Sequence, residues 1–436
     1  MNSDGAADPQ TLPRTIGFWG TALLPVNGMI GAGIFALPAI MASAVGNFAP
    51  WMMLIGALLM LPIILVFATL AARYDGHGGV ILYANSAFGP FAGFQAGWTR
   101  YASGAVAVAA NTQVAVAYLA VLFPVLEIPT IKAASVIGFI VFITVVNILG
   151  MRMSVVTLGV MTVIKLAPLF GLIVFGLATR DPAIGFSLPE FSAFESVVLL
   201  TFYAYMAFEN GTFPAGELRN PKRDIPLALV TTLAAVTVFY MVVIWAYIAV
   251  APAIVGDESA MTAAAGELAG QAGVIALSVA AAFSICSNTL CGGIVTPRMT
   301  FGMAEQGMLP KIFAHVSRRF QTPDFSIIFY GAVAILFSLW AGFAALAVAS
   351  TLSRLVMYLL GAMALPVLDR RSGSRYPAWH LPVAILAALS SLWVASQASA
   401  QAYQILLLIL VVGSGLFFLE RTTGVTDAKS ATEGEG

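Results

Sequence analysis

The sequence predicts an all-α membrane protein with twelve transmembrane helices. Of its 436 residues, 60% are hydrophobic and only 9% are charged, and the mean hydropathy is +0.94. A soluble domain carries about 25% charged residues, so this composition excludes a soluble fold. The 20 basic and 20 acidic residues balance, so nucleic acid is not an expected partner. The partner that the composition requires is the lipid bilayer.

Twelve apolar segments are long enough to cross the hydrocarbon core, which takes about 20 residues. In chain order they cover residues 16–42, 50–72, 88–123, 133–150, 154–178, 194–217, 226–250, 271–300, 325–342, 344–368, 380–397 and 402–419. We expect the chain to have five parts. They are a cytoplasmic tail at 1–15, a five-helix repeat at 16–178, a second, inverted five-helix repeat at 179–368, two additional helices at 380–419, and a cytoplasmic tail at 420–436.

The distribution of basic residues predicts the orientation. Loops on the side of the N-terminus hold most of the 20 basic residues, whereas the opposite loops hold only Lys132 and Arg180. Basic residues accumulate in cytoplasmic loops. We therefore expect a multi-pass protein of the cell membrane with both termini in the cytoplasm.

Residues that carry enzyme chemistry are scarce. The two cysteines, Cys286 and Cys291, share one apolar segment, and the three histidines, His77, His315 and His380, all fall in loops. No glycine-rich loop ends in Lys-Ser or Lys-Thr, which excludes an ATP-driven pump. We expect no metal site, no cofactor and no enzymatic activity.

The first and sixth segments contain residues that interrupt a helix. The stretch PVNGMIGAGIFALP places Gly28, Gly31 and Gly33 at the centre of the first segment, although each glycine costs a helix roughly 1 kcal/mol relative to alanine. The sixth segment buries Glu209 beside Asn210, so this carboxylate must face a cavity or a partner. Breaks in the first and sixth of ten helices predict a 5+5 inverted repeat with a binding site where the breaks meet. The alternative is that the glycines only permit close helix packing.

The chemistry of the two breaks suits an α-amino acid. Unpaired amides at the start of a half-helix attract a carboxylate, and the candidates are Gly31, Ala32 and Gly33. Freed carbonyl groups attract an ammonium group, and the candidates are Gly28, Met29, Tyr203 and Ala204.

Several motifs resemble those of the amino acid–polyamine–organocation transporter family. They are GMIGAGIFALP, GGVILYANSAFGPFAGFQAGW, ENGTFPAGELRNPKRDIPLAL and TPRMTFGMAEQGMLPKIF, and the resemblance covers residues 14–420. It implies the inverted-repeat fold with two extra helices and transport activity. It also implies that four residues of the third helix face the substrate, namely Ser103, Gly104, Val108 and Asn111. In the sixth helix, it implies that Tyr203 and Glu209 belong to the substrate site. Ala32 stands where many relatives have serine, which leaves the carboxylate to backbone amides.

Lys165 predicts coupling to protons. It lies eleven residues from Ser154, about 16 Å into the membrane. Ser284 and Ser287 fall at a similar depth. In some proton-coupled members of the resembling family, a lysine of the fifth helix replaces a sodium ion between the first and eighth helices. An amine held away from water releases its proton more easily than an exposed one.

Two further cations lie within predicted helices. Arg100 and Glu209 fall in the same half of the membrane, and an ion pair between them would explain both charges. The pair could be structural, or it could take part in gating or proton transfer. Arg354 has no partner that the sequence identifies.

These features predict a secondary active transporter of α-amino acids that takes up its substrate with protons by alternating access. The small residues of the expected lining favour a neutral amino acid over a dication. The alternative is an amino acid/amine exchanger of the arginine/agmatine antiporter type, in which Lys165 would be unnecessary. A channel would need a continuous polar stripe, which no segment shows. A homodimer is compatible with the sequence.

Overall fold

The computed structural model describes residues 17–73, 79–150, 155–180, 188–212, 218, 220–251, 256–373 and 376–433. The predicted tail at 1–15 lies outside these ranges, as does Ser154, from which the depth of Lys165 was counted. The described residues form helices and connecting segments, with no β-strand among them.

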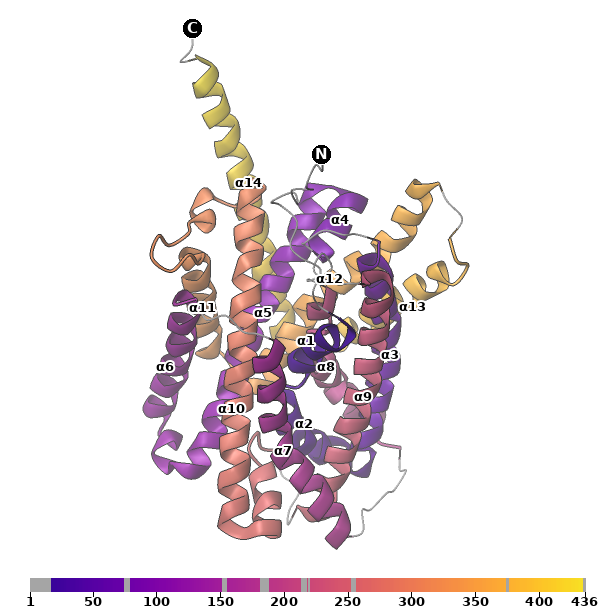
Figure 1. Cartoon of the computed structure of the whole chain (residues 1–436), viewed down its shortest axis with the longest axis vertical. Coiled ribbons are helices and arrows are strands. Elements are labelled where there is room, and N and C mark those ends of the chain that lie inside the picture. Colours follow the sequence, from indigo (N-terminus) through magenta and orange to yellow (C-terminus); the bar gives the residue numbers. More distant parts are fainter. Residues whose placement is uncertain are drawn as a thin grey trace, which may run out of the picture.

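The helices follow one another in the order shown in Figure 1. The α-helices are α1 (Phe18–Met29), α2 (Gly33–Val45), α3 (Ala49–Ala71), α4 (Val80–Phe88), α5 (Pro90–Leu122), α6 (Pro129–Ile148), α7 (Val155–Thr179), α8 (Phe191–Tyr205), α9 (Pro221–Val250), α10 (Met261–Glu305), α11 (Asp324–Ser338), α12 (Phe343–Ser372), α13 (His380–Ser396) and α14 (Ala400–Glu433). Short 3₁₀ helices are η1 (Gly46–Phe48), η2 (Pro124–Glu127), η3 (Phe208–Thr212) and η5 (Lys311–Ala314).

The helices identify a multi-pass membrane protein. Within the described ranges, nine helical stretches are long and apolar enough to cross a membrane. The stretch Gly33–Ala71 combines α2 with α3, and two further apolar helices, α11 and α13, are shorter than 18 residues. Every one of the predicted segments overlaps a helix, although α14 continues to Glu433, past the predicted end of its span.

Both predicted interruptions are present. Helix α1 ends at Met29 and α2 begins at Gly33. The second interruption follows Tyr203 and Ala204, because α8 ends at Tyr205 and the chain turns at Ala207, whose φ is +69°. Glu209 and Asn210 therefore belong to η3, after the break, rather than to the break itself.

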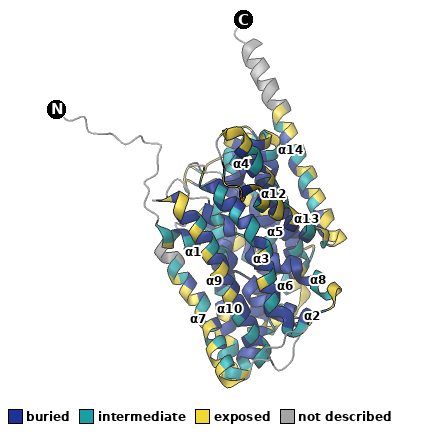
Figure 2. Cartoon of the chain, turned by 90° about the vertical axis from the view of Figure 1, so that its right-hand side faces the viewer, coloured by how far each residue is buried: buried dark blue, intermediate teal, exposed yellow. Residues whose placement is uncertain are grey.

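Helix α5 forms the centre of the bundle and packs against α10, α11 and α12. Helices α1 and α2 pack against α9, and α2 also contacts α8. Helices α6 and α7 expose much of their apolar surface, whereas α5 and α12 are mostly buried. Helix α6 lies at the edge of the bundle in Figure 1, and Figure 2 shows the exposed residues along α7. Helix α4 and the end of α14 lie at the same end of the molecule (Figure 1).

Candidate functional site

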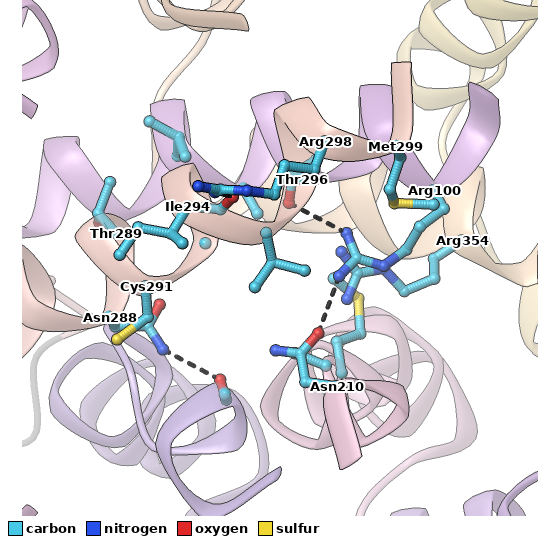
Figure 3. A pocket seen from close by; sticks show the side chains of 18 of the residues that line it. Arg100, Asn210, Asn288, Thr289, Cys291, Ile294, Thr296, Arg298, Met299 and Arg354 are labelled. Carbon is cyan, nitrogen blue, oxygen red and sulfur yellow. Dashed lines mark hydrogen bonds between the residues drawn. The ribbon is translucent and has the colours of Figure 1, made fainter. Parts of the chain in front are cut away.

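A cavity of about 600 Å³ lies where the two interrupted helices meet. Residues from α1, α2, α5, α8 and α10 line it, and Figure 3 shows part of this lining. Along α10 the lining runs from Asn288 to Gln306, about 27 Å at 1.5 Å per residue. Ile81 and Asn85 of α4 also line it, so the cavity extends toward the end of the molecule that holds α4.

The interruption between α1 and α2 presents backbone groups to the cavity. Gly31, Ala32 and Gly33 all line it. Their amides donate to no backbone carbonyl within the described part of the chain, and the first bonds of α2 run from Phe35 and Ala36 to the Ala32 oxygen. Unpaired amides at a helix start carry partial positive charge. The arrangement can bind an anion such as a carboxylate.

The glycines of this segment also lie against neighbouring helices. A Cβ atom at Gly28 would lie 2.9 Å from the carbonyl oxygen of Ala207, and one at Gly33 would lie 2.9 Å from the Tyr240 hydroxyl. At Gly31 it would lie 3.0 Å from Asn288 Cγ. Close packing and access to the backbone therefore both require glycine here.

Two of the carbonyl groups that the sequence offered to an ammonium group, those of Gly28 and Met29, already accept hydrogen bonds. Asn288 donates to the Gly28 oxygen at 3.2 Å and to the Asn27 oxygen at 2.6 Å, and Tyr240 donates to the Met29 oxygen at 3.4 Å. Each carbonyl keeps a second lone pair. Gly28 and Met29 line the cavity.

Three polar side chains of the cavity lining are joined by hydrogen bonds. The Tyr203 hydroxyl donates to Asn111 Oδ1 at 2.7 Å, and Asn111 Nδ2 donates to Asn288 Oδ1 at 3.3 Å. The Tyr203 ring also meets the edge of Phe343, with ring centres 5.7 Å apart. Helices α8, α5 and α10 are thereby joined beside the site. Ala204, predicted with Tyr203, is buried and does not line the cavity.

The expected substrate-facing positions of α5 divide into two groups. Gly104, Val108 and Asn111 line the cavity. Ser103 does not, because its side chain is fully buried and hydrogen-bonds to the Ser350 carbonyl at 2.9 Å. The Ser103 hydroxyl also accepts a hydrogen bond from Arg354 Nε at 3.0 Å. Ser103 therefore joins α5 to α12.

The predicted contact between Arg100 and Glu209 is present and includes a third charge. Arg100 Nε lies 2.9 Å from Glu209 Oε1, and Arg354 Nη1 lies 3.1 Å from the same oxygen. The Tyr358 hydroxyl donates to Glu209 Oε2 at 3.2 Å, and Arg100 Nη2 donates to Asn210 Oδ1 at 2.9 Å. We call Arg100, Glu209 and Arg354 the charged triad. Both arginines line the cavity, but Glu209 lies behind them and is not part of the lining.

Lys165 is fully buried against the interruption of α1. Its ammonium group donates to the Ile30 carbonyl and to Asn27 Oδ1, each at 2.9 Å. Asn27 Nδ2 in turn donates to Thr162 Oγ1 at 2.9 Å. The amine therefore links α7 to the residue at which α1 ends.

The two serines expected beside Lys165 lie elsewhere. The Ser287 hydroxyl contacts the Met161 sulfur at 3.0 Å, and no hydrogen-bond acceptor for Ser284 lies within the described part of the chain. The two serines lie at a similar depth to Lys165 but do not contact its amine. Depth along a helix does not determine toward which neighbour a side chain points. The link between α10 and α1 comes instead from Asn288.

Comparison with known proteins agrees with this geometry. The family model described as "Amino acid permease" matches residues 16–415. The chain belongs to the amino acid permease family. The permease is 27% identical over 435 residues to the serine/threonine exchanger SteT of Bacillus subtilis, covering 96% of this chain and 93% of that protein. It is also 28% identical over 332 residues to an uncharacterized transporter of Mycobacterium tuberculosis, covering 74% and 73% of the two chains. The permease is a transporter of amino acids and not an enzyme.

Sequence reasoning missed the asparagines that organise the permease site. Asn27 holds Lys165, Asn288 joins α10 to α1, and Asn210 joins η3 to Arg100. Each stands in an apolar segment, where an unpaired amide would be costly, and that alone could have identified them. Within the described ranges, no group of three or more His, Cys, Asp or Glu side chains is placed to hold a metal ion.

Proposed function

We propose that the permease carries α-amino acids through the cavity by alternating access, with the substrate carboxylate on the amides of Gly31, Ala32 and Gly33. The observation that carries this proposal is the row of amides that face the cavity without a backbone acceptor. A carboxylate there completes the hydrogen bonds that the interrupted helix lacks. The ammonium group then lies near the carbonyl groups of Gly28 and Met29, whose second lone pairs can accept from it.

The proposed architecture is twelve membrane-spanning helices, ten of them in a 5+5 inverted repeat. Support comes from the paired interruptions, which touch each other at Gly28 and Ala207. Carriers with inverted repeats place their substrate where two such interrupted helices meet. We place the basic loops in the cytoplasm. The end that holds α4 then faces the cytoplasm, both termini lie on the cytoplasmic side of the cell membrane, and the cavity extends toward the cytoplasm.

The proposed coupling ion is a proton carried by Lys165. Its ammonium group holds the Ile30 carbonyl at the edge of the carboxylate site. A neutral amine donates a weaker hydrogen bond than an ammonium group does. Loss of the proton therefore loosens the contact between α7 and the interruption of α1. In this proposal, the loosened contact favours opening of the cavity toward the cytoplasm. Ser284 and Ser287 have no part in this proposal.

Exchange of amino acids is a second candidate, because the name of the Bacillus relative describes an exchanger. The two modes differ in what drives net movement. Empty proteoliposomes with an inward proton gradient accumulate substrate if the permease is a symporter. If it is an exchanger, uptake requires vesicles that have been loaded with amino acid. Comparing empty with loaded vesicles, with and without the gradient, distinguishes them.

The binding proposal has a direct test. The purified permease is screened by thermal shift against the twenty amino acids and common polyamines. A ligand at 100 times its dissociation constant raises the free energy of unfolding by about 2.7 kcal/mol. We expect stabilisation by α-amino acids and none by their decarboxylated amines, which lack the carboxylate. Stabilisation by the amines and not by the amino acids would overturn the carboxylate site.

A further inference from the structure

The charge that faces the cavity has one sign. Its lining contains Arg100, Arg298 and Arg354, and no aspartate or glutamate occurs among the described residues that line it. Glu209 neutralises one of these charges from behind. The charged triad thus consists of two guanidinium groups and one carboxylate, and the side chains of its arginines are only 4% exposed.

The two arginines of the triad differ in how their nitrogen atoms are used. Arg100 directs Nε to Glu209, Nη2 to Asn210 and Nη1 to Thr296, the last at 3.5 Å. Arg354 directs Nε to Ser103 and Nη1 to Glu209. Within the described part of the chain, no oxygen accepts a hydrogen bond from Arg354 Nη2. Figure 3 shows the two guanidinium groups side by side beneath α10, above Asn210.

Arg354 lines the cavity, and its Nη2 donates to no oxygen in the described part of the chain, so an anion in the cavity can accept from it. Guanidinium is suited to this because its planar fork matches a carboxylate. The proposed function already places the substrate's α-carboxylate at the start of α2. Arg354 lines the same cavity as the start of α2, so a second carboxylate on the substrate is the anion that we place at Arg354.

We infer that the triad is a side-chain subsite, in which Arg354, supported by Arg100, binds a carboxylate, and that the permease selects acidic α-amino acids. This inference rests on the proposed function and replaces the expectation of a neutral substrate. The same positive lining repels cationic amino acids and polyamines.

The test compares pairs of ligands that differ only in charge. Binding of L-aspartate is measured against L-asparagine and of L-glutamate against L-glutamine, by thermal shift and by inhibition of uptake in proteoliposomes. L-Lysine is the cationic control. We expect one acid to bind at least about tenfold more tightly than its amide, as close charge pairs provide, and we expect no binding of L-lysine. Equal or tighter binding of the amides overturns the inference but leaves the proposed function intact. Absence of binding by every α-amino acid overturns the proposed function itself.

A substitution at Arg354 tests the residue. Arg354→Gln leaves a balanced pair of Arg100 with Glu209, so we expect it to fold and to bind the acid at least about tenfold more weakly, with amide binding little changed. Arg354→Lys keeps the charge and retains part of the preference. Lys132→Gln removes the same charge from the start of α6, away from the cavity lining, and serves as the control. An unchanged acid-to-amide ratio in Arg354→Gln overturns the assignment. If Arg354→Gln does not fold, the ligand comparison on the native permease decides the question alone.

Discussion

The ammonium nitrogen of Lys165 lies 2.9 Å from the carbonyl oxygen of Ile30, the residue that follows the last turn of α1. Ile30 begins the interruption whose next three residues present their amides to the cavity. A change of charge at one side chain of α7 therefore acts directly on the backbone at the proposed carboxylate site. In the mechanism that we propose, this contact connects proton binding with substrate binding.

Replacement of Lys165 should separate coupling from binding. We expect Lys165→Ala to abolish accumulation driven by a pH gradient while substrate binding in detergent survives, because the amine contacts Ile30 and Asn27 and does not line the cavity. The measurement is uptake into proteoliposomes with an imposed gradient, with Lys132→Ala as control. Accumulation at the native level by Lys165→Ala, or uptake that follows sodium and ignores pH, would remove this lysine from coupling.

The charged triad changes what a double substitution should do. Glu209→Gln leaves two buried guanidinium groups without their shared carboxylate, and we expect a loss of about 3–5 kcal/mol in the free energy of unfolding. Adding Arg100→Met should restore only part of this loss, since Arg354 still lacks its partner. Adding Arg354→Met as well should restore more. Thermal unfolding of the single, double and triple variants measures these couplings, and strictly additive effects would show that the contacts do not hold the helices together.

Two glycines of the cavity lining should respond differently to alanine. A Cβ atom at Gly28 would lie 2.9 Å from the backbone oxygen of Ala207, whereas one at Gly292 would have no neighbour within 4 Å. We expect Gly28→Ala to push the two interruptions apart, with a cost of about 1–3 kcal/mol and loss of uptake. Gly292→Ala, on α10, should fold and retain uptake. Similar behaviour of the two variants would mean that the close contact is not maintained.

The backbone amides predict a related result at the start of α2. We expect Gly31→Val and Gly33→Val to abolish substrate binding while the protein still inserts into the membrane, because a branched side chain would collide with Asn288 or the Tyr240 hydroxyl and displace the amides. Gly17→Ala is the control, because a Cβ atom at Gly17 would have no neighbour within 4 Å. Normal uptake by either valine variant at normal expression argues against carboxylate binding at this segment.

Cys291 can report which side of the membrane reaches the cavity. Its side chain lines the cavity, whereas Cys286 does not. In a Cys286→Ser background, we expect an impermeant thiol reagent to label Cys291 from the side of α4, and we expect substrate to slow the labelling. Tyr203→Phe removes the hydrogen bond to Asn111, worth about 1 kcal/mol. It should therefore raise labelling from the opposite side about fivefold. Labelling from that side alone in the native protein would contradict the proposed orientation.

The sequence by itself determined that the permease crosses the membrane and where its helices are interrupted. Hydrophobic length identifies a span because the bilayer core has a fixed thickness, and glycine or a buried carboxylate inside a span identifies a break. These signals are local. They predicted the break before Gly33 and a break in the sixth segment, with freed carbonyl groups near Tyr203 and Ala204, and α8 ends at Tyr205.

Only the tertiary structure decided which buried polar groups meet. Arg354 had no recognisable partner because its partner, Glu209, is distant in sequence and lies on another helix. Ser287 shares the depth of Lys165 but faces Met161. The hydropathy of a segment sets its depth, whereas the rotation and crossing of packed helices set which side chains touch. The charge of the cavity therefore became visible only when α5, η3 and α12 were brought together.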